Sequence, residues 1–251
     1  MNIELDILLP AFLAGLLVLA THIPFGMRIL QRGVIFADLA VAQIAGLGVI
    51  IAELLGLLGQ PLLVQAVAAT SALSGAALLA WIERRVPHVK EAAIGLTFVL
   101  AASLGILLMS RDVHAGEHLQ DMLVGQILWV GKQQLIATAL LTAILLIVWK
   151  LFHQRLGEFG FYALFALAIT ASVQLVGIYL VFASLIVPAL ATHRRAKLRA
   201  PHAFAIGIAG YAAGLWLSVW LDLPAGAAIV WAIAIVSGVS LLATSKQSHL
   251  A

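Results

Sequence analysis

The sequence predicts an all-α integral membrane protein, a polytopic bundle of about eight transmembrane helices plus one broken, re-entrant helix. Three observations support this prediction: the composition, the lengths of the charge-free runs and the distribution of basic residues. Of the 251 residues, 63% are hydrophobic and only 10% are charged. A soluble domain carries about 25% charged residues, so this chain has too few polar residues to cover a water-facing surface. We therefore expect a lipid bilayer around most of it.

The charge and cysteine content exclude several classes of protein. The formal net charge is +3, but the basic residues lie in short loops between apolar runs, which argues against nucleic-acid binding. The chain has no cysteine, which excludes disulfides and thiolate metal sites. A cleaved signal peptide is not expected, because Glu4 and Asp6 stand where such a peptide has a positive region.

The apolar runs have the lengths of membrane spans. Crossing the hydrocarbon core takes about 20 apolar residues. The charge-free runs that meet or approach this length are 7–27, 54–82, 92–110, 133–149, 159–192, 200–221 and 223–245. A further run, 34–58, is interrupted by Asp38 and Glu53. No segment has the composition of a linker, so we expect residues 1–251 to form a single transmembrane domain.

The basic residues predict the orientation, because cytoplasmic loops of membrane proteins carry an excess of Lys and Arg. One alternating path places 12 of the 14 basic residues in the cytoplasm: Arg28, Arg32, Arg84, Arg85, Lys90, Lys150, Arg155, Arg194, Arg195, Lys197, Arg199 and Lys246. Arg111 and Lys132 fall in one outer segment. The path puts the N-terminus outside and the C-terminus in the cytoplasm of a multi-pass membrane protein.

The run 159–192 predicts a broken helix. Both of its ends, at Arg155 and Arg194, lie on the cytoplasmic side of this path, so the chain must enter the membrane and return. One straight helix would extend about 50 Å, against a hydrocarbon core of about 30 Å. Two full spans need about 40 residues. We expect one span and one short helix that meet near Val176-Gly177, an arrangement typical of transporters and channels.

Ionisable side chains within a span are costly and usually mark a functional site. Asp38 is expected about one turn inside the second span, with Gln43 about 140° further around the helix. Asp38 either contacts a transported ion or snorkels to the cytoplasmic interface and pairs with Arg28 or Arg32. Glu91 is expected to lie in the first turn of its helix, where the helix dipole favours an acidic residue. His22 is expected to be a hydrogen-bonded core residue.

The outer segment contains two imidazoles and two carboxylates at helical spacing: His114, Glu117, His118 and Asp121. On a helix these four side chains lie within about 100° of arc. Imidazole and carboxylate together suit zinc, manganese or iron(II). The alternative is a solvated polar face on a short amphipathic helix. We favour metal contact, because polar residues are scarce in this chain.

Several motifs bear on enzymatic activity. The chain has no G-x-x-x-x-G-K-[ST] sequence, so ATP binding through a P-loop is not expected of it. His114-Ala-Gly-Glu117-His118 fits the inverted zincin pattern H-x-x-E-H, which makes an intramembrane metallopeptidase a rival hypothesis. Gly116 within that pattern, and its position directly after a span, argue against a peptidase.

Gly210 and Gly214 match a small-xxx-small packing pattern.

Four parts of the chain resemble the permease subunits of bacterial zinc/manganese/iron ABC importers, the ABC-3 family. They occur in the family's order and cover most of the chain. The parts are RGVIFADLAVAQIAGLG at 32–48, EAAIG at 91–95 with LVGQILW at 123–129, VGIYLVFASLIVPALAT at 176–192 and LDLPAGAAIV at 221–230.

This resemblance implies a type II ABC importer-like fold and a place in the bacterial inner (cytoplasmic) membrane. It also implies a homodimer of permease subunits that works with cytoplasmic P-loop ATPase subunits and an external metal-binding protein. The chain itself is then no enzyme, and no cofactor stays bound, since the zinc, manganese or iron ion is transported. An ATP-independent metal carrier or channel is the alternative.

The chain departs from the family pattern at two places. The family commonly has G-D-x-x-x-H in its second helix, whereas here Gln43 takes the His position and Asp38 stands one place before the acid. The outer histidines and acids are expected to compensate as an external metal site. Between Phe152 and Leu156 the chain is shorter than its relatives. ATPase coupling is therefore expected to depend on the basic segment Arg194, Arg195, Lys197 and Arg199.

Overall fold

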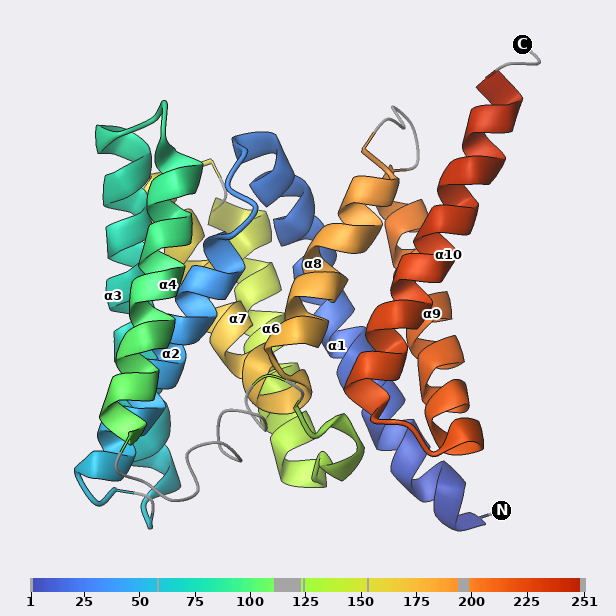
Figure 1. Ribbon diagram of the computed structural model, residues 1–251, viewed down its shortest axis with the longest axis horizontal. Coiled ribbons are helices and arrows are strands. Elements are labelled where there is room, and N and C mark those ends of the chain that lie inside the picture. The colour runs from blue at the N-terminus through green and yellow to red at the C-terminus, as the bar shows by residue number, and fades with distance from the viewer. Residues whose placement is uncertain are drawn as a thin grey trace. The chain divides into compact units, whose positions relative to one another are not determined.

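The fold is helical throughout the part of the chain that the computed structural model describes, residues 2–57, 59–110, 123, 125–152, 154–193 and 199–248 (Figure 1). Within these ranges, eight helices are long and apolar enough to cross a membrane, and one apolar helix is shorter. The predicted class, a polytopic bundle of about eight spans plus a broken helix, is confirmed.

The helices follow the apolar runs closely. In chain order they are α1 (Asn2–Arg32), α2 (Ala37–Leu54), α3 (Pro61–Arg85), α4 (Lys90–Met109), the 3-10 turn η1 (Ile127–Trp129), α6 (Lys132–Phe152), α7 (Gly157–Val176), α8 (Ile178–Ala191), α9 (Arg199–Leu221) and α10 (Ala225–Ser248). Pro61 begins α3, where the missing N–H of proline costs nothing. The short loop between Phe152 and Gly157 joins α6 directly to α7.

The predicted break in the run 159–192 lies at Gly177. This residue has φ of 79° and ψ of 165°, a conformation that is essentially restricted to glycine. α7 has 20 residues and α8 has 14 residues. At 1.5 Å per residue α8 extends about 21 Å, which is too short to cross a hydrocarbon core of about 30 Å. The expected combination of one span and one short helix is confirmed.

The helices group into two compact units. Unit 1 comprises Met1–Arg32, Leu123–Thr142 and Leu175–Ala251, and therefore contains α1, η1, the first half of α6, and α8 to α10. Unit 2 comprises Gly33–Met122 and Ala143–Gln174, with α2, α3, α4, the second half of α6 and α7. The description of residues 1–251 as a single domain stays a prediction.

In unit 1, α8 packs against α1, α9 and α10. Small residues allow these helices to approach closely. A Cβ atom on Gly26 would lie 2.0 Å from the carbonyl oxygen of Leu185, and one on Gly214 would lie 2.4 Å from the Cα of Ile229. The small-xxx-small pattern at Gly210 and Gly214 is thus a helix-packing motif, in which α9 lies against α10.

A buried hydrogen bond joins α8 to α9, where Ser184 Oγ and Tyr211 OH are 2.9 Å apart. Tyr211→Phe removes this bond and leaves the Ser184 hydroxyl without its partner, so we expect the free energy of unfolding to fall by about 1–2 kcal/mol. Thermal unfolding in detergent checks this. Tyr179→Phe is the matched control, because Tyr179 is exposed. Equal shifts for the two variants would contradict the assignment.

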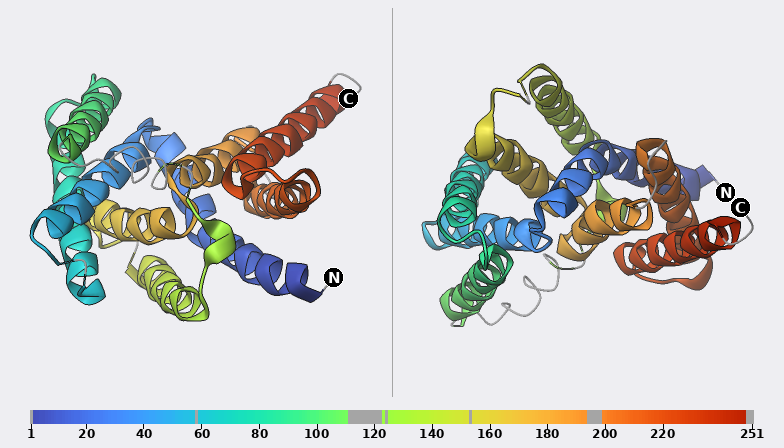
Figure 2. Two further views of the ribbon diagram at one scale, coloured as in Figure 1. Left: turned by 60° about the horizontal axis from the view of Figure 1, so that its bottom comes forward. Right: turned by 90° about the horizontal axis from the view of Figure 1, so that it is seen from above.

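In unit 2, α2 packs against both α3 and α4, and the three helices lie side by side in every view (Figures 1 and 2). Gly48 brings α2 close to α3, since a Cβ there would lie 2.6 Å from the Ser71 hydroxyl. Trp149 of α6 packs on Phe161 of α7, and the two ring centroids are 5.6 Å apart. The first residues of α2, Ala37 and Asp38, are buried in this unit.

Candidate metal centre

The candidate centre lies at the start of α2. Residues before the helix form a turn in which the Ala37 N–H donates to the Val34 carbonyl at 3.2 Å. α2 therefore begins at Ala37, and Asp38 is its second residue. The expectation that Asp38 lies a full turn inside the span is wrong, because the first residues of the apolar run form the turn and not the helix.

Asp38 is buried, with 1% of its surface exposed. Neither carboxylate oxygen has a hydrogen-bond partner among the residues that the structure describes. The backbone amides of Asp38 and Leu39, at the positive end of the α2 dipole, lie close enough to offset part of its charge. A carboxylate that snorkels to the interface would be hydrated, so this burial is inconsistent with the snorkelling alternative.

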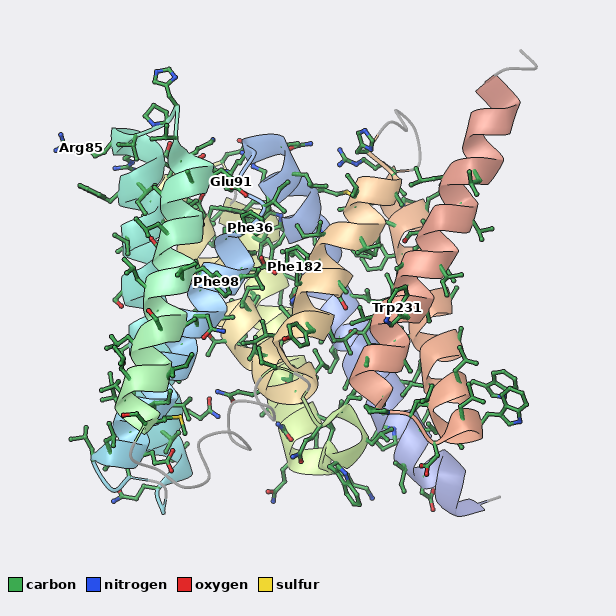
Figure 3. The ribbon with its side chains drawn as sticks, viewed as in Figure 1. Phe36, Arg85, Glu91, Phe98, Phe182 and Trp231 are labelled. Carbon is green, nitrogen blue, oxygen red and sulfur yellow. The ribbon has the colours of Figure 1, made fainter. Side chains whose placement is uncertain are left out.

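Glu91 of α4 reaches the same place. It lies in the first turn of its helix, as expected, and its Oε1 accepts a hydrogen bond of 3.1 Å from the Phe36 N–H. Phe36 is the N-cap residue of α2, so a carboxylate from α4 caps the N-terminus of α2 (Figure 3). Glu91 Oε2 is buried and has no hydrogen-bond partner within the described ranges. The Glu91 carboxylate also lies near enough to Asp38 for the two negative charges to interact.

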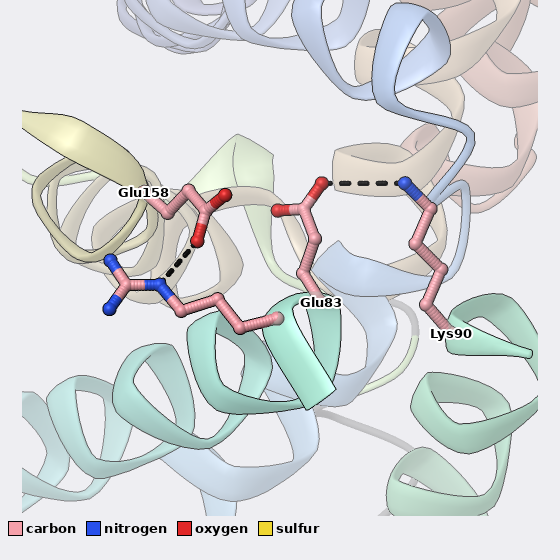
Figure 4. A network of polar contacts seen from close by, with 4 residues as sticks. Glu83, Lys90 and Glu158 are labelled. Carbon is pink, nitrogen blue, oxygen red and sulfur yellow. Dashed lines mark hydrogen bonds and ion pairs between the residues drawn. The ribbon is translucent and has the colours of Figure 1, made fainter. Parts of the chain in front are cut away.

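The basic residues around this end of unit 2 already bind other acids (Figure 4). Lys90 Nζ lies 3.4 Å from Glu83 Oε1, and Arg84 Nε lies 2.5 Å from Glu158 Oε2. Lys90 also interacts with its neighbour Glu91 through space. These pairs join the C-terminus of α3 to the N-termini of α4 and α7 and leave Asp38 without a direct cationic partner among the described residues.

Gln43 is half-buried on α2, about 7.5 Å further along the helix axis from Asp38 and about 140° around it. The pair therefore does not share one face, as the sequence indicated. In the described ranges no three His, Asp or Glu side chains come together closely enough to hold a metal ion. The structure instead brings Glu91, which the sequence had assigned only to a helix end, to the start of α2 near Asp38.

Of the other predicted site residues, the structure describes only Arg199. His114, Glu117, His118 and Asp121 lie outside the described residues, as do Arg194, Arg195 and Lys197. Arg199 is the first residue of α9 and is half-buried. The external metal site and the coupling segment stay predictions.

His22 of α1 is a buried core residue, and the structure agrees with the expectation of a hydrogen bond. Its Nδ1 lies 3.1 Å from Thr21 Oγ1, and that hydroxyl donates to the Val18 carbonyl at 3.2 Å. Nε2 is buried without a hydrogen-bond partner among the described atoms.

The fold and the buried ionisable groups define a polytopic helical membrane protein of the class that includes transport permeases. The comparison with known families is specific. The chain belongs to the ABC 3 transport family, whose model matches residues 4–158 and 152–244. The two matches overlap at residues 152–158, and the resemblance found in the sequence is confirmed.

Solved structures share the fold. PsaBC from Streptococcus pneumoniae, in complex with Fab, superposes with a TM-score of 0.70 and 24% sequence identity, covering 93% of this chain and 89% of that chain. A metal-chelate type ABC transporter in an inward-facing conformation gives a TM-score of 0.65 at 16% identity, covering 93% of this chain and 85% of that chain. At these identities the similarity establishes the fold alone.

Curated relatives are similar in sequence over part of their length. A "probable iron transport system membrane protein" of Haemophilus influenzae is 31% identical over 163 residues, which are 56% of this chain and 60% of the relative. The "manganese transport system membrane protein MntC" of Halalkalibacterium halodurans is 26% identical over 183 residues, or 64% of this chain and 63% of the relative. The matches thus span less than two thirds of either relative.

Proposed function

We propose that this chain is the membrane-spanning permease subunit of an ABC transporter that imports a divalent transition metal ion, namely zinc, manganese or iron. The observation that carries the proposal is Asp38, a buried carboxylate without a hydrogen-bond donor inside a membrane chain of this family. An uncompensated charge at such a position is expensive to maintain and usually marks an ion pathway. The iron and manganese names of the two curated relatives support a metal ion as the cargo.

The proposed assembly follows from the family. Two copies of the chain form a homodimer in the bacterial inner membrane, with N-termini outside and C-termini in the cytoplasm. Each copy binds a cytoplasmic P-loop ATPase subunit, and an external metal-binding protein docks on the outer face. The orientation is supported by unit 2, where two ion pairs and the hydrogen bond from Phe36 to Glu91 hold Arg84 and Lys90 at the same end as the start of α2.

In the proposed mechanism the external protein releases its ion near His114, Glu117, His118 and Asp121. The ion then passes between the two copies of the chain and meets Gln43 before Asp38, which lies at the cytoplasmic end of α2. ATP hydrolysis in the partner subunit switches the dimer through the segment that contains Arg194, Arg195, Lys197 and Arg199. Ligands of intermediate strength admit the ion and still release it.

The experiment that tests this function is isolation of the complex from membranes. A tagged chain, expressed with its neighbouring genes, is expected to copurify with a P-loop ATPase whose activity rises in the presence of the loaded metal-binding protein. Inactivating the Walker A lysine of that ATPase should abolish metal uptake by cells. Uptake that persists without an active ATPase would contradict the proposal and favour an ATP-independent carrier or channel.

A further inference from the structure

We propose that Asp38 of α2 and Glu91 of α4 together form a two-carboxylate site that binds a divalent cation at the N-terminal end of α2, with Mn²⁺ preferred over Zn²⁺. This inference rests on the proposed function, because the bound cation is the transported ion. It assigns Glu91 a ligand role beyond its place in the first turn of α4.

The geometry leaves oxygen atoms available for a cation. The Phe36 N–H holds Glu91 Oε1 at 3.1 Å and so fixes the position of the carboxylate. The three remaining oxygens, Asp38 Oδ1, Asp38 Oδ2 and Glu91 Oε2, are buried and lack hydrogen-bond partners in the described ranges. Asp38 and Glu91 come from different helices that pack on each other, and the hydrogen bond to Phe36 holds the Glu91 carboxylate at the start of α2, two residues before Asp38.

Electrostatics gives the reason for a cation. The backbone amides near Asp38 offset only part of the cost of burying its charge, and the Glu91 carboxylate nearby adds repulsion. Lys90 and Arg84 of unit 2 are bound to Glu83 and Glu158. A divalent ion between Asp38 and Glu91 would neutralise both charges and occupy the free oxygens at once.

The capping contact alone does not explain Glu91. A neutral amide would satisfy the Phe36 N–H equally well, because its carbonyl oxygen also accepts a hydrogen bond. A carboxylate brings an additional negative charge toward Asp38, which is a disadvantage unless a cation shares the site.

The donor atoms indicate which cation fits. The two side chains supply only carboxylate oxygens, and the residue at the family's imidazole position is Gln43, which lies on another face of α2 and brings no imidazole to the site. Oxygen ligands suit Mn²⁺, whereas imidazole and thiolate ligands favour Zn²⁺. We therefore expect the site to bind Mn²⁺ with less competition from Zn²⁺ than a site that contains histidine.

The test uses Glu91→Gln, which keeps the hydrogen bond to Phe36 and removes the charge. Mn²⁺ binding to the purified complex is measured by equilibrium dialysis, alongside Mn²⁺ uptake by cells at matched membrane abundance. We expect Glu91→Gln to weaken binding about 10- to 100-fold, to weaken uptake in parallel, and to add little to the effect of Asp38→Asn. Glu53→Gln, at the opposite end of the same helix as Asp38, is the control and should retain wild-type binding.

The outcomes separate this inference from the proposed function. If Glu91→Gln binds and transports Mn²⁺ like wild type while Asp38→Asn does not, Glu91 is only a cap and the inference fails, but the function stands. If Glu91→Ala loses Mn²⁺ binding while Glu91→Gln retains it, Glu91 is likewise only a cap for α2. If the wild-type complex neither binds nor transports a metal ion, both fail. If Glu91→Gln does not reach the membrane, Glu91→Asp is tested in its place, because it keeps the charge on a shorter side chain. Wild-type Mn²⁺ affinity of Glu91→Asp would also overturn the site.

Discussion

Asp38→Asn is expected to reduce metal uptake at least tenfold while the protein still reaches the membrane. The substitution keeps the size of the side chain and removes the buried negative charge that attracts the ion. Metal content of whole cells, measured by mass spectrometry at matched membrane abundance, checks the effect. Glu53→Gln is the control, since it changes an acid of the same helix far from the site. Wild-type uptake by Asp38→Asn would contradict the role of Asp38.

The same variant is expected to be at least as stable as wild type in metal-free buffer. The Asp38 carboxylate has no hydrogen-bond partner among the described residues, and a neutral amide is less costly to bury than a charge. Thermal unfolding of the two proteins in chelator measures this difference. Loss of uptake without loss of stability would separate a functional carboxylate from a structural one.

Gly125→Ala is expected to cause a large loss of stability, because a positive φ and a close backbone approach coincide at this residue. Gly125 has φ of 69°, and a Cβ there would lie 2.2 Å from the carbonyl carbon of Val176 and 2.3 Å from the nitrogen of Gly177. The obstructing atoms are backbone at the break between α7 and α8, so they cannot move aside as a flexible side chain would. We expect the free energy of unfolding to fall by about 3 kcal/mol or more.

Two glycines allow the causes of that loss to be separated. Gly56 has φ of 73° and open space around its Cβ position, so Gly56→Ala measures the cost of the backbone conformation alone. Gly131 has open space and no positive φ, so Gly131→Ala should be close to neutral. Thermal unfolding in detergent compares the three. If Gly125→Ala is no worse than Gly56→Ala, the close approach to Val176 and Gly177 is not important for stability.

The membrane spans and the broken helix could be predicted because they depend on local properties. A span requires a long apolar run, and the run 159–192 is too long for one helix and too short for two. The break then lies at Gly177, because glycine tolerates the backbone conformation of the break best. The position of Asp38 within its helix was misjudged, because an apolar run does not reveal that its first residues, here Val34 to Phe36, form a turn.

The contact between Glu91 and α2 could not be predicted by the same means. The two residues that it joins, Phe36 and Glu91, are 55 positions apart, and nothing in the pattern of either segment indicates the other. The resemblance to known permeases did include both 32–48 and 91–95. The resemblance therefore pointed to both segments, but it did not indicate a contact between their side chains.

By itself, the sequence determined that this protein lies in a membrane, which segments cross it and where one helix breaks. Those features depend on the polarity and length of each segment, and lipid imposes the same requirement on every helix regardless of its neighbours. Only the tertiary structure decided that Asp38 is buried without a donor and that Glu91 binds the start of α2. Burial and pairing depend on which helices pack together, and that choice is made by the whole set of side chains at once.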